Sequence, residues 1–163
     1  MNYVKTTIGI FALLAFSRFI PHPPNFTIML ALSFYVPVIF GLKFLPALVL
    51  SFVITDIFIG FHETVIFTWG SMILIGLISR HFNSNIVYRV SGSLIGTFIF
   101  FIISNFGVWT FGTYGYDLKG LLICYTLAIP FFGYSFISTL FYSSLIEGIF
   151  SIKKVRSFLV TLK

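Results

Sequence analysis

Charged residues are scarce in this sequence of 163 residues. Asp, Glu, Lys and Arg make up 9% of it, whereas 58% is hydrophobic and 20% is aromatic. Soluble domains carry about 25% charged residues, so the composition excludes an ordinary water-soluble domain. The formal net charge is +6. The basic residues are spread between apolar runs without forming a patch with interleaved aromatics, which argues against a nucleic-acid partner.

Cysteine and catalytic motifs are also nearly absent. The single cysteine, Cys124, excludes an intrachain disulfide and a multi-cysteine metal site. The chain lacks Gly-x-Ser-x-Gly, His-Glu-x-x-His and Walker-type motifs, and no two carboxylates lie close together in the sequence. The segments between apolar runs are too short to hold a nucleotide. We therefore expect a protein that is not an enzyme, with no catalytic residues and no cofactor.

Apolar runs long enough to cross a membrane recur along the chain. A crossing helix needs about 17 to 25 apolar residues, because the hydrocarbon layer is about 30 Å thick. The last apolar region is too long for one ordinary crossing and contains Pro130. We therefore expect a partial or interfacial helix over Gly120 to Phe132 before the final crossing. The sequence predicts an all-α membrane protein with one domain over 1–163 and six transmembrane helices at about 6–20, 26–41, 44–60, 64–79, 90–111 and 133–150.

The basic residues predict the orientation of these spans. Positive residues concentrate on the cytoplasmic side of membrane proteins. With six spans, both termini share one side, and only Arg18 and Lys119 fall toward the other. We therefore predict a multi-pass protein of the bacterial plasma (inner) membrane, in contact with membrane lipid and with N and C termini cytoplasmic. The residues expected on the cytoplasmic side are Lys5, Lys43, Arg80, Arg89, Lys153, Lys154, Arg156 and Lys163.

Polar side chains within the predicted spans gather toward the opposite, outer half. An Asp or Arg inside a membrane costs about 2.5 to 3.5 kcal/mol on insertion scales, so each needs a partner or a watery cavity. Asp56 lies near the outer end of the third span, and Arg18 lies at a similar depth in the first. The two are natural counter-ions. Such a pair can tie helices together, bind a substrate, or do both.

Other side chains at this depth predict the walls of an outward-facing pocket. Asn105 and Trp109 are one helical turn apart, and Tyr114 follows in a loop rich in glycine and aromatic residues. The spacing of the histidines and acids is not diagnostic of a metal site, and we predict none. The predicted substrate-binding residues are Arg18, His22, Asn25, Asp56, His62, Asn105, Trp109 and Tyr114.

Four runs of the sequence carry a resemblance to known membrane proteins: 18–27, 56–62, 105–109 and 124–132. They resemble an uncharacterised family of small bacterial membrane proteins that is likened to the substrate-binding S components of energy-coupling factor (ECF) transporters. The resemblance implies a small-molecule solute, a vitamin or micronutrient, held in an outward-facing pocket for uptake. It also implies an energising ECF-type module as a partner.

Alternatives to this function stay open on the sequence alone. The small residues Gly9, Ala12 and Ala15 recur every three positions, which departs from the four-residue spacing of the docking face of S components, so a solitary carrier is one alternative. A structural or assembly subunit of a membrane complex, with no ligand of its own, is another. A membrane-embedded enzyme would need an acid and a base in one cavity, and only Asp56, Glu63 and the histidines supply such groups.

Overall fold

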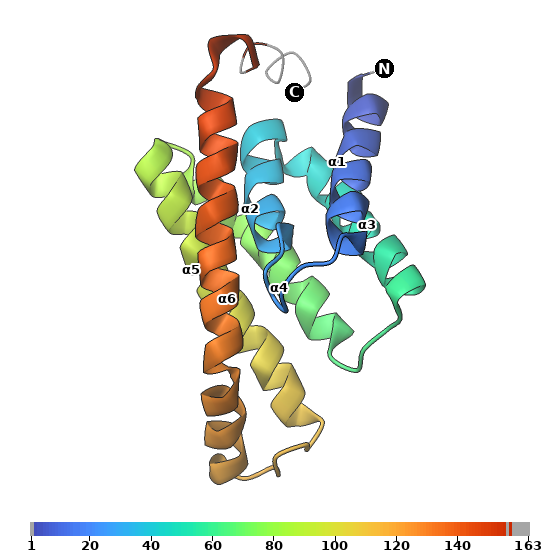
Figure 1. Ribbon diagram of the computed structural model, residues 1–163, viewed down its shortest axis with the longest axis vertical. Helices are drawn as coiled ribbons and strands as arrows, with labels where there is room; N and C mark the ends of the chain where they lie inside the picture. Colours follow the sequence, from blue (N-terminus) through green and yellow to red (C-terminus); the bar gives the residue numbers. More distant parts are fainter. Residues whose placement is uncertain (1, 156, 158–163) are drawn as a thin grey trace.

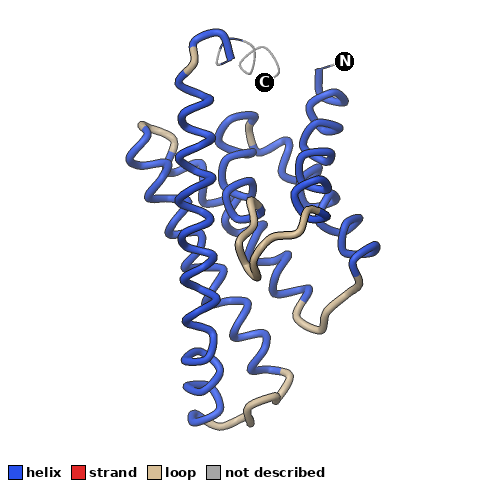
Figure 2. The backbone as a smooth tube through the Cα atoms, viewed as in Figure 1, coloured by secondary structure: helices blue, strands red, loops and turns tan. Residues whose placement is uncertain are grey.

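The chain forms a bundle of helices that run alternately up and down, in a computed structural model that describes residues 2–155 and 157 (Figure 1). These residues include two short 3-10 helices, η1 (Leu42–Phe44) and η2 (Ser79–Phe82). This described part contains no strand, as Figure 2 shows, which confirms the predicted all-α class. The α-helices are α1 (Asn2–Phe19), α2 (Met29–Phe40), α3 (Leu45–Ile59), α4 (Val65–Ile78), α5 (Ile86–Thr110) and α6 (Leu118–Ser151).

Among the described residues, four helical segments are long and apolar enough to cross a membrane. They are Leu42–Ile59, Val65–Phe82, Ile86–Thr110 and Leu118–Ser151. The apolar helix α2 has only 12 residues, and α1 is not among the four because Lys5 and Arg18 lower its hydropathy. Each of the six predicted spans overlaps a described α-helix, but four helical segments have the length and composition of a membrane crossing, so the six-span count stays a prediction.

Helix α6 differs from the sequence prediction. It runs without interruption for 34 residues, so the expected separate partial helix over Gly120 to Phe132 is wrong. Pro130 removes a backbone hydrogen bond and crowds the preceding turn, but a helix can continue through proline when its neighbours hold it. Here the hydroxyl of Tyr125 donates to the carbonyl of Ile102 on α5 at 2.7 Å. This contact fastens the part of α6 before the proline to α5.

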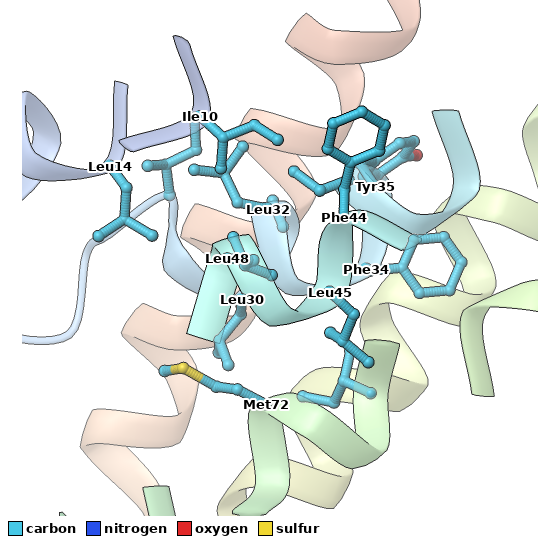
Figure 3. Close-up of a cluster of buried hydrophobic side chains, with 14 of the residues drawn as sticks. Ile10, Leu14, Leu30, Leu32, Phe34, Tyr35, Phe44, Leu45, Leu48 and Met72 are labelled. Carbon is cyan, nitrogen blue, oxygen red and sulfur yellow. The ribbon is translucent and has the colours of Figure 1, made fainter. Parts of the chain in front are cut away.

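The buried core surrounds α2. Every residue of α2 from Leu30 to Val38 is buried, as expected for a helix at the centre of a bundle. Figure 3 shows side chains from α1, α3 and α4 converging on it, including Leu14, Leu48 and Met72. The α2 segment is therefore held on all sides by packing, although it is the shortest of the apolar helices.

Helices α5 and α6 form an antiparallel hairpin. At the end where residues 111–117 join them, the hairpin projects beyond the other helices (Figure 1). The first turn of α1 and the last turn of α6 lie at the opposite end of the molecule. Arg156 and Lys163, which the sequence assigns to the cytoplasmic side, lie outside the described residues.

Candidate functional site

Arg18 and Asp56 form an ion pair, as the sequence predicts. The Nη1 atom of Arg18 in α1 lies 2.5 Å from Oδ1 of Asp56 in α3, and the two side chains are 14% and 4% exposed. The indole N–H of Trp69 in α4 donates to Oδ2 of the same carboxylate at 2.7 Å. Both carboxylate oxygens therefore have a partner, and the pair links three helices.

The hydroxyl of Thr55 holds the guanidinium of Arg18 from a second direction. Nη1 of Arg18 donates to Oγ1 of Thr55 at 2.7 Å. That hydroxyl lies 2.9 Å from the carbonyl of Ser51 and 3.0 Å from the carbonyl of Phe52, to which it donates. A guanidinium has only donors, so the hydroxyl accepts from Arg18 while its own proton points to the backbone. The orientation of the guanidinium is therefore fixed by buried groups of α3.

A cavity of about 550 Å³ opens beside this ion pair. Arg18 is part of its wall, together with side chains from α2, α4, α5, α6 and the loops before α2 and α4. Ligand cavities typically measure about 300 to 1,000 Å³ and combine apolar walls with a few converging polar groups. The apolar wall includes Met29, Met72, Phe100, Phe101, Phe131 and Phe132, and the hydroxyl-bearing residues are Thr27, Thr64, Thr68, Thr97, Ser104 and Ser135.

The loop between α1 and α2 brings Asn25 to the cavity. Asn25 has a φ of 60°, a left-handed conformation that asparagine adopts more readily than most residues. The next residue, Phe26, packs its ring against Phe141 and Tyr142 of α6, with centroids 6.2 and 6.0 Å away. The hydroxyl of Ser138, which donates to the carbonyl of Ser135 at 3.0 Å, also lies 3.5 Å from the carbonyl of Asn25. The loop is therefore anchored on α6 and covers part of the cavity.

Four of the eight predicted binding residues line this cavity. Asn105 reaches it from α5, where its Nδ2 donates to the carbonyl of Phe101 at 2.8 Å. His62 reaches it from the loop before α4, with Nδ1 lying 3.0 Å from Oγ1 of Thr64. The four are Arg18, Asn25, His62 and Asn105.

The other four predicted residues lie outside the cavity walls. Asp56 does not line the cavity, but it forms an ion pair with Arg18, which does. His22 is exposed, with Nδ1 lying 3.0 Å from the carbonyl of Pro23. Trp109 and Tyr114 are in and after the last turn of α5, where the hairpin projects past the other helices. Trp109 packs on Phe106 at a centroid distance of 5.5 Å.

Metal binding has no support in the described residues. Among residues 2–155 and 157, no group of three or more His, Cys, Asp or Glu side chains is placed to hold a metal ion. The thiol of Cys124 is buried and donates to the carbonyl of Asn105 at 3.4 Å. This contact helps to pack α6 against the cavity-bearing part of α5.

A second ion pair, which the sequence analysis did not predict, lies near the start of α5. Nε and Nη2 of Arg89 donate to Oε1 and Oε2 of Glu147 in α6 at 2.6 and 2.7 Å. This two-point geometry is the strong form of an arginine–carboxylate contact. The side chains are 13% and 6% exposed. The sequence analysis places Arg89 only among the basic residues expected on the cytoplasmic side.

Two pairs of hydroxyl side chains connect the second ion pair with the cavity. We call them the α5–α6 seam: Ser93 with Ser143, whose Oγ atoms are 2.9 Å apart, and Thr97 with Thr139, whose Oγ1 atoms are 3.0 Å apart. Residues four apart share a helix face. The signal that could have found the seam is therefore a repeat of four, with Arg89, Ser93 and Thr97 on α5 and Ser135, Thr139, Ser143 and Glu147 on α6.

Glycines on the neighbouring face of α5 set the position of the seam. A Cβ on Gly92 would lie 2.6 Å from the Phe82 ring, and one on Gly96 would lie 3.0 Å from a side-chain carbon of Ile75. Small residues allow membrane helices to approach closely. The close packing of this glycine face on η2 and α4 leaves the Ser/Thr face turned toward α6.

These features define an all-helical protein of membrane type, with a partly polar cavity enclosed by apolar helices. Residues 2–160 match a family described as a family of unknown function, DUF6580. The chain belongs to this family. No curated protein and no solved structure matches it.

Proposed function

We propose that this protein binds a small solute in the cavity beside Arg18 and serves the uptake of that solute. The observation that carries the proposal is the convergence of Arg18, Asn25 and Asn105 on a cavity of about 550 Å³. Polar side chains inside a membrane protein need partners or a watery cavity. Arg18 and Asn105 have protein partners and also border the cavity, where a solute can accept hydrogen bonds from their remaining N–H groups.

The proposal places the protein in the bacterial plasma (inner) membrane with six crossings and cytoplasmic termini. In support, α1 begins and α6 ends at the same end of the bundle (Figure 1). Lys5, Lys43, Arg80 and Arg89 belong to segments at that end, where the positive-inside rule favours the cytoplasm. With cytoplasmic termini, the loop between α3 and α4 faces outward, and the presence of its residues His62 and Thr64 in the cavity wall supports an outward-facing cavity.

The wall chemistry favours a polar solute with a flat apolar part. Asp56 balances the charge of Arg18, so this pair adds no net charge to the cavity. Amide and hydroxyl groups of Asn25, Asn105 and Ser104 offer both donors and acceptors, and the rings of the apolar wall offer surfaces for stacking. A vitamin or related micronutrient, as in an ECF S component, has this combination.

Energy for uptake has to come from outside the described fold. Residues 2–155 are taken up by helices and short connections, which leaves no room for a nucleotide-binding domain within them. An energising ECF-type module is the partner that the proposal favours. A solitary carrier driven by an ion gradient is the alternative.

A second candidate function is a structural or assembly subunit with no ligand of its own. The observation in its favour is that Asp56 has a partner for each of its oxygens, Arg18 and Trp69. The cluster joins α1, α3 and α4 without any solute. In that case the cavity is filled by water or lipid, and mutations of its wall affect only stability.

Identification of retained compounds separates the two candidates. The full chain is purified in mild detergent, and small molecules released on denaturation are identified by mass spectrometry. We expect one compound to be enriched with the wild type and lost with Asn105→Ala. The control is Asn83→Ala, because Asn83 is exposed and outside the cavity wall. No enriched compound would favour the structural subunit. Equal retention of a compound by both variants would show that Asn105 does not contribute to its binding.

A further inference from the structure

Two cavities lie at opposite ends of the α5–α6 seam. Thr97, at one end of the seam, lines the cavity beside Arg18, and so does Ser135. At the other end, Arg89 and Glu147 line a second cavity of about 370 Å³, together with Asn85 and Phe150. The two hydroxyl pairs of the seam lie between these ends on the facing sides of α5 and α6.

The hydroxyl pairs of the seam hold α5 and α6 together only weakly. Interhelical hydrogen bonds between Ser and Thr side chains contribute little to membrane-protein stability on average, because each hydroxyl readily finds another partner. Water or a polar solute can replace the Ser93–Ser143 and Thr97–Thr139 contacts at small cost. An interface of Leu and Phe side chains would offer a polar solute no such replacement.

The Arg89–Glu147 pair holds α5 and α6 together strongly at the far end of the seam. Separation of these side chains would leave a buried charge without its partner, which is strongly unfavourable. The hydroxyl of Tyr35 in α2 is buried near Glu147. It makes no hydrogen bond to any of the described residues. It is a donor that can take the place of Arg89 when the pair opens.

We propose that the α5–α6 seam is the path from the solute cavity to the far end of the bundle and that the Arg89–Glu147 pair is its gate. This inference rests on the proposed function, since the path serves a solute held in the cavity. The solute class is the same one, a polar molecule able to exchange hydrogen bonds with the hydroxyls of the seam. Opening requires α6 to move away from α5 at the Glu147 end while the Tyr125 contact holds the other end.

Thiol labelling from each side of the membrane tests the gate without knowledge of the solute. The single native cysteine is removed by Cys124→Ser, and Ser104→Cys places a reporter on the cavity wall. A small membrane-impermeant thiol reagent is applied to intact cells and to inside-out vesicles. Modification at position 104 is read by peptide mass spectrometry.

We expect the reporter to react in cells and to be protected in inside-out vesicles. Glu147→Gln should raise its labelling rate in the vesicles at least about tenfold, the change in open fraction that corresponds to about 1.4 kcal/mol. Arg89→Gln should act in the same direction, and the charge-reversed pair Arg89→Glu with Glu147→Arg should restore protection. The control is Glu63→Gln, because Glu63 is an exposed acid outside both cavities.

A reversible crosslink tests the seam itself. In the Glu147→Gln background, Ser93→Cys with Ser143→Cys places two thiols where the native hydroxyls are 2.9 Å apart. Oxidation should remove the extra labelling in vesicles, and reduction should restore it. A separate Ser71→Cys reporter, at a buried position outside both cavities, reports unfolding, because it reacts only when the fold opens generally.

The outcomes separate this inference from the proposed function. Unchanged labelling in Glu147→Gln and Arg89→Gln, with Ser71→Cys protected, overturns the gate even if a retained solute has been found. Labelling that persists after oxidation overturns the seam as the path. A labelling increase that the crosslink abolishes supports both the gate and the seam as the path. It does so even if the purified protein retains no solute.

Discussion

Replacement of Asp56 by alanine should destabilise the protein more than loss of a surface ion pair would. The change removes the partner of Arg18 and the acceptor of the Trp69 indole N–H, which are 2.5 and 2.7 Å from the carboxylate. Removal of one member of a buried pair costs about 3 to 5 kcal/mol, because the other charge stays buried. Arg18 is 14% exposed and borders a cavity, so water screens it in part and we expect about 3 kcal/mol.

The double substitution Arg18→Met with Asp56→Leu isolates the pairing from the burial of charge. It leaves no unpaired charge, although the Trp69 indole N–H still loses its acceptor. We therefore expect the double variant to be more stable than Asp56→Ala and to lie within about 1 to 3 kcal/mol of the wild type. Reversible unfolding of the full chain in mixed micelles, followed by tryptophan fluorescence, measures both free energies. Arg18→Met alone and Asp56→Leu alone complete the mutant cycle.

Additive effects in this cycle would refute the reasoning. If the double variant lost as much stability as the two single variants together, the two side chains would not be coupled, and the salt bridge would contribute nothing measurable. The same variants also address binding. A stable double variant that still retains the wild-type compound would show that the guanidinium of Arg18 does not contact the solute.

Three further predictions concern packing and hydrogen bonds. Gly107→Ala should lower stability by about 1 to 3 kcal/mol, because its Cβ would meet the Phe67 ring at 2.5 Å, whereas Gly133→Ala, with nothing within 4 Å, should be neutral or stabilising in thermal unfolding. Trp69→Phe should cost about 1.5 to 3 kcal/mol in denaturant unfolding, since the charged Asp56 loses a donor, and an unchanged midpoint would contradict the 2.7 Å contact. Thr97→Val should cost only about 0.6 kcal/mol of unfolding free energy in the same assay. A loss above about 2 kcal/mol would contradict the description of the hydroxyl pairs of the seam as weak contacts.

The sequence by itself determined the class of fold and one part of the site. Apolar runs separated by short polar segments specify helices, because a membrane-length apolar segment must satisfy its backbone hydrogen bonds internally. The pairing of Arg18 with Asp56 followed from the free-energy cost of charged side chains inside a membrane. Two isolated charges at similar depth are far less favourable than one ion pair. The structure confirms both predictions.

The tertiary structure alone decided which polar side chains share a cavity and which helix faces meet. Asn105 and Trp109 lie on one face of α5, but only Asn105 lines the cavity, because the α5–α6 hairpin extends past the other helices. Pro130 did not end α6, because contacts with α5 hold the turns before it. The Arg89–Glu147 pair depends on the orientation of α5 about its own axis. Packing of Gly92 and Gly96 against η2 and α4 sets that orientation. Periodicity places residues on a face, whereas the direction of that face is set by the shapes of all neighbouring helices together.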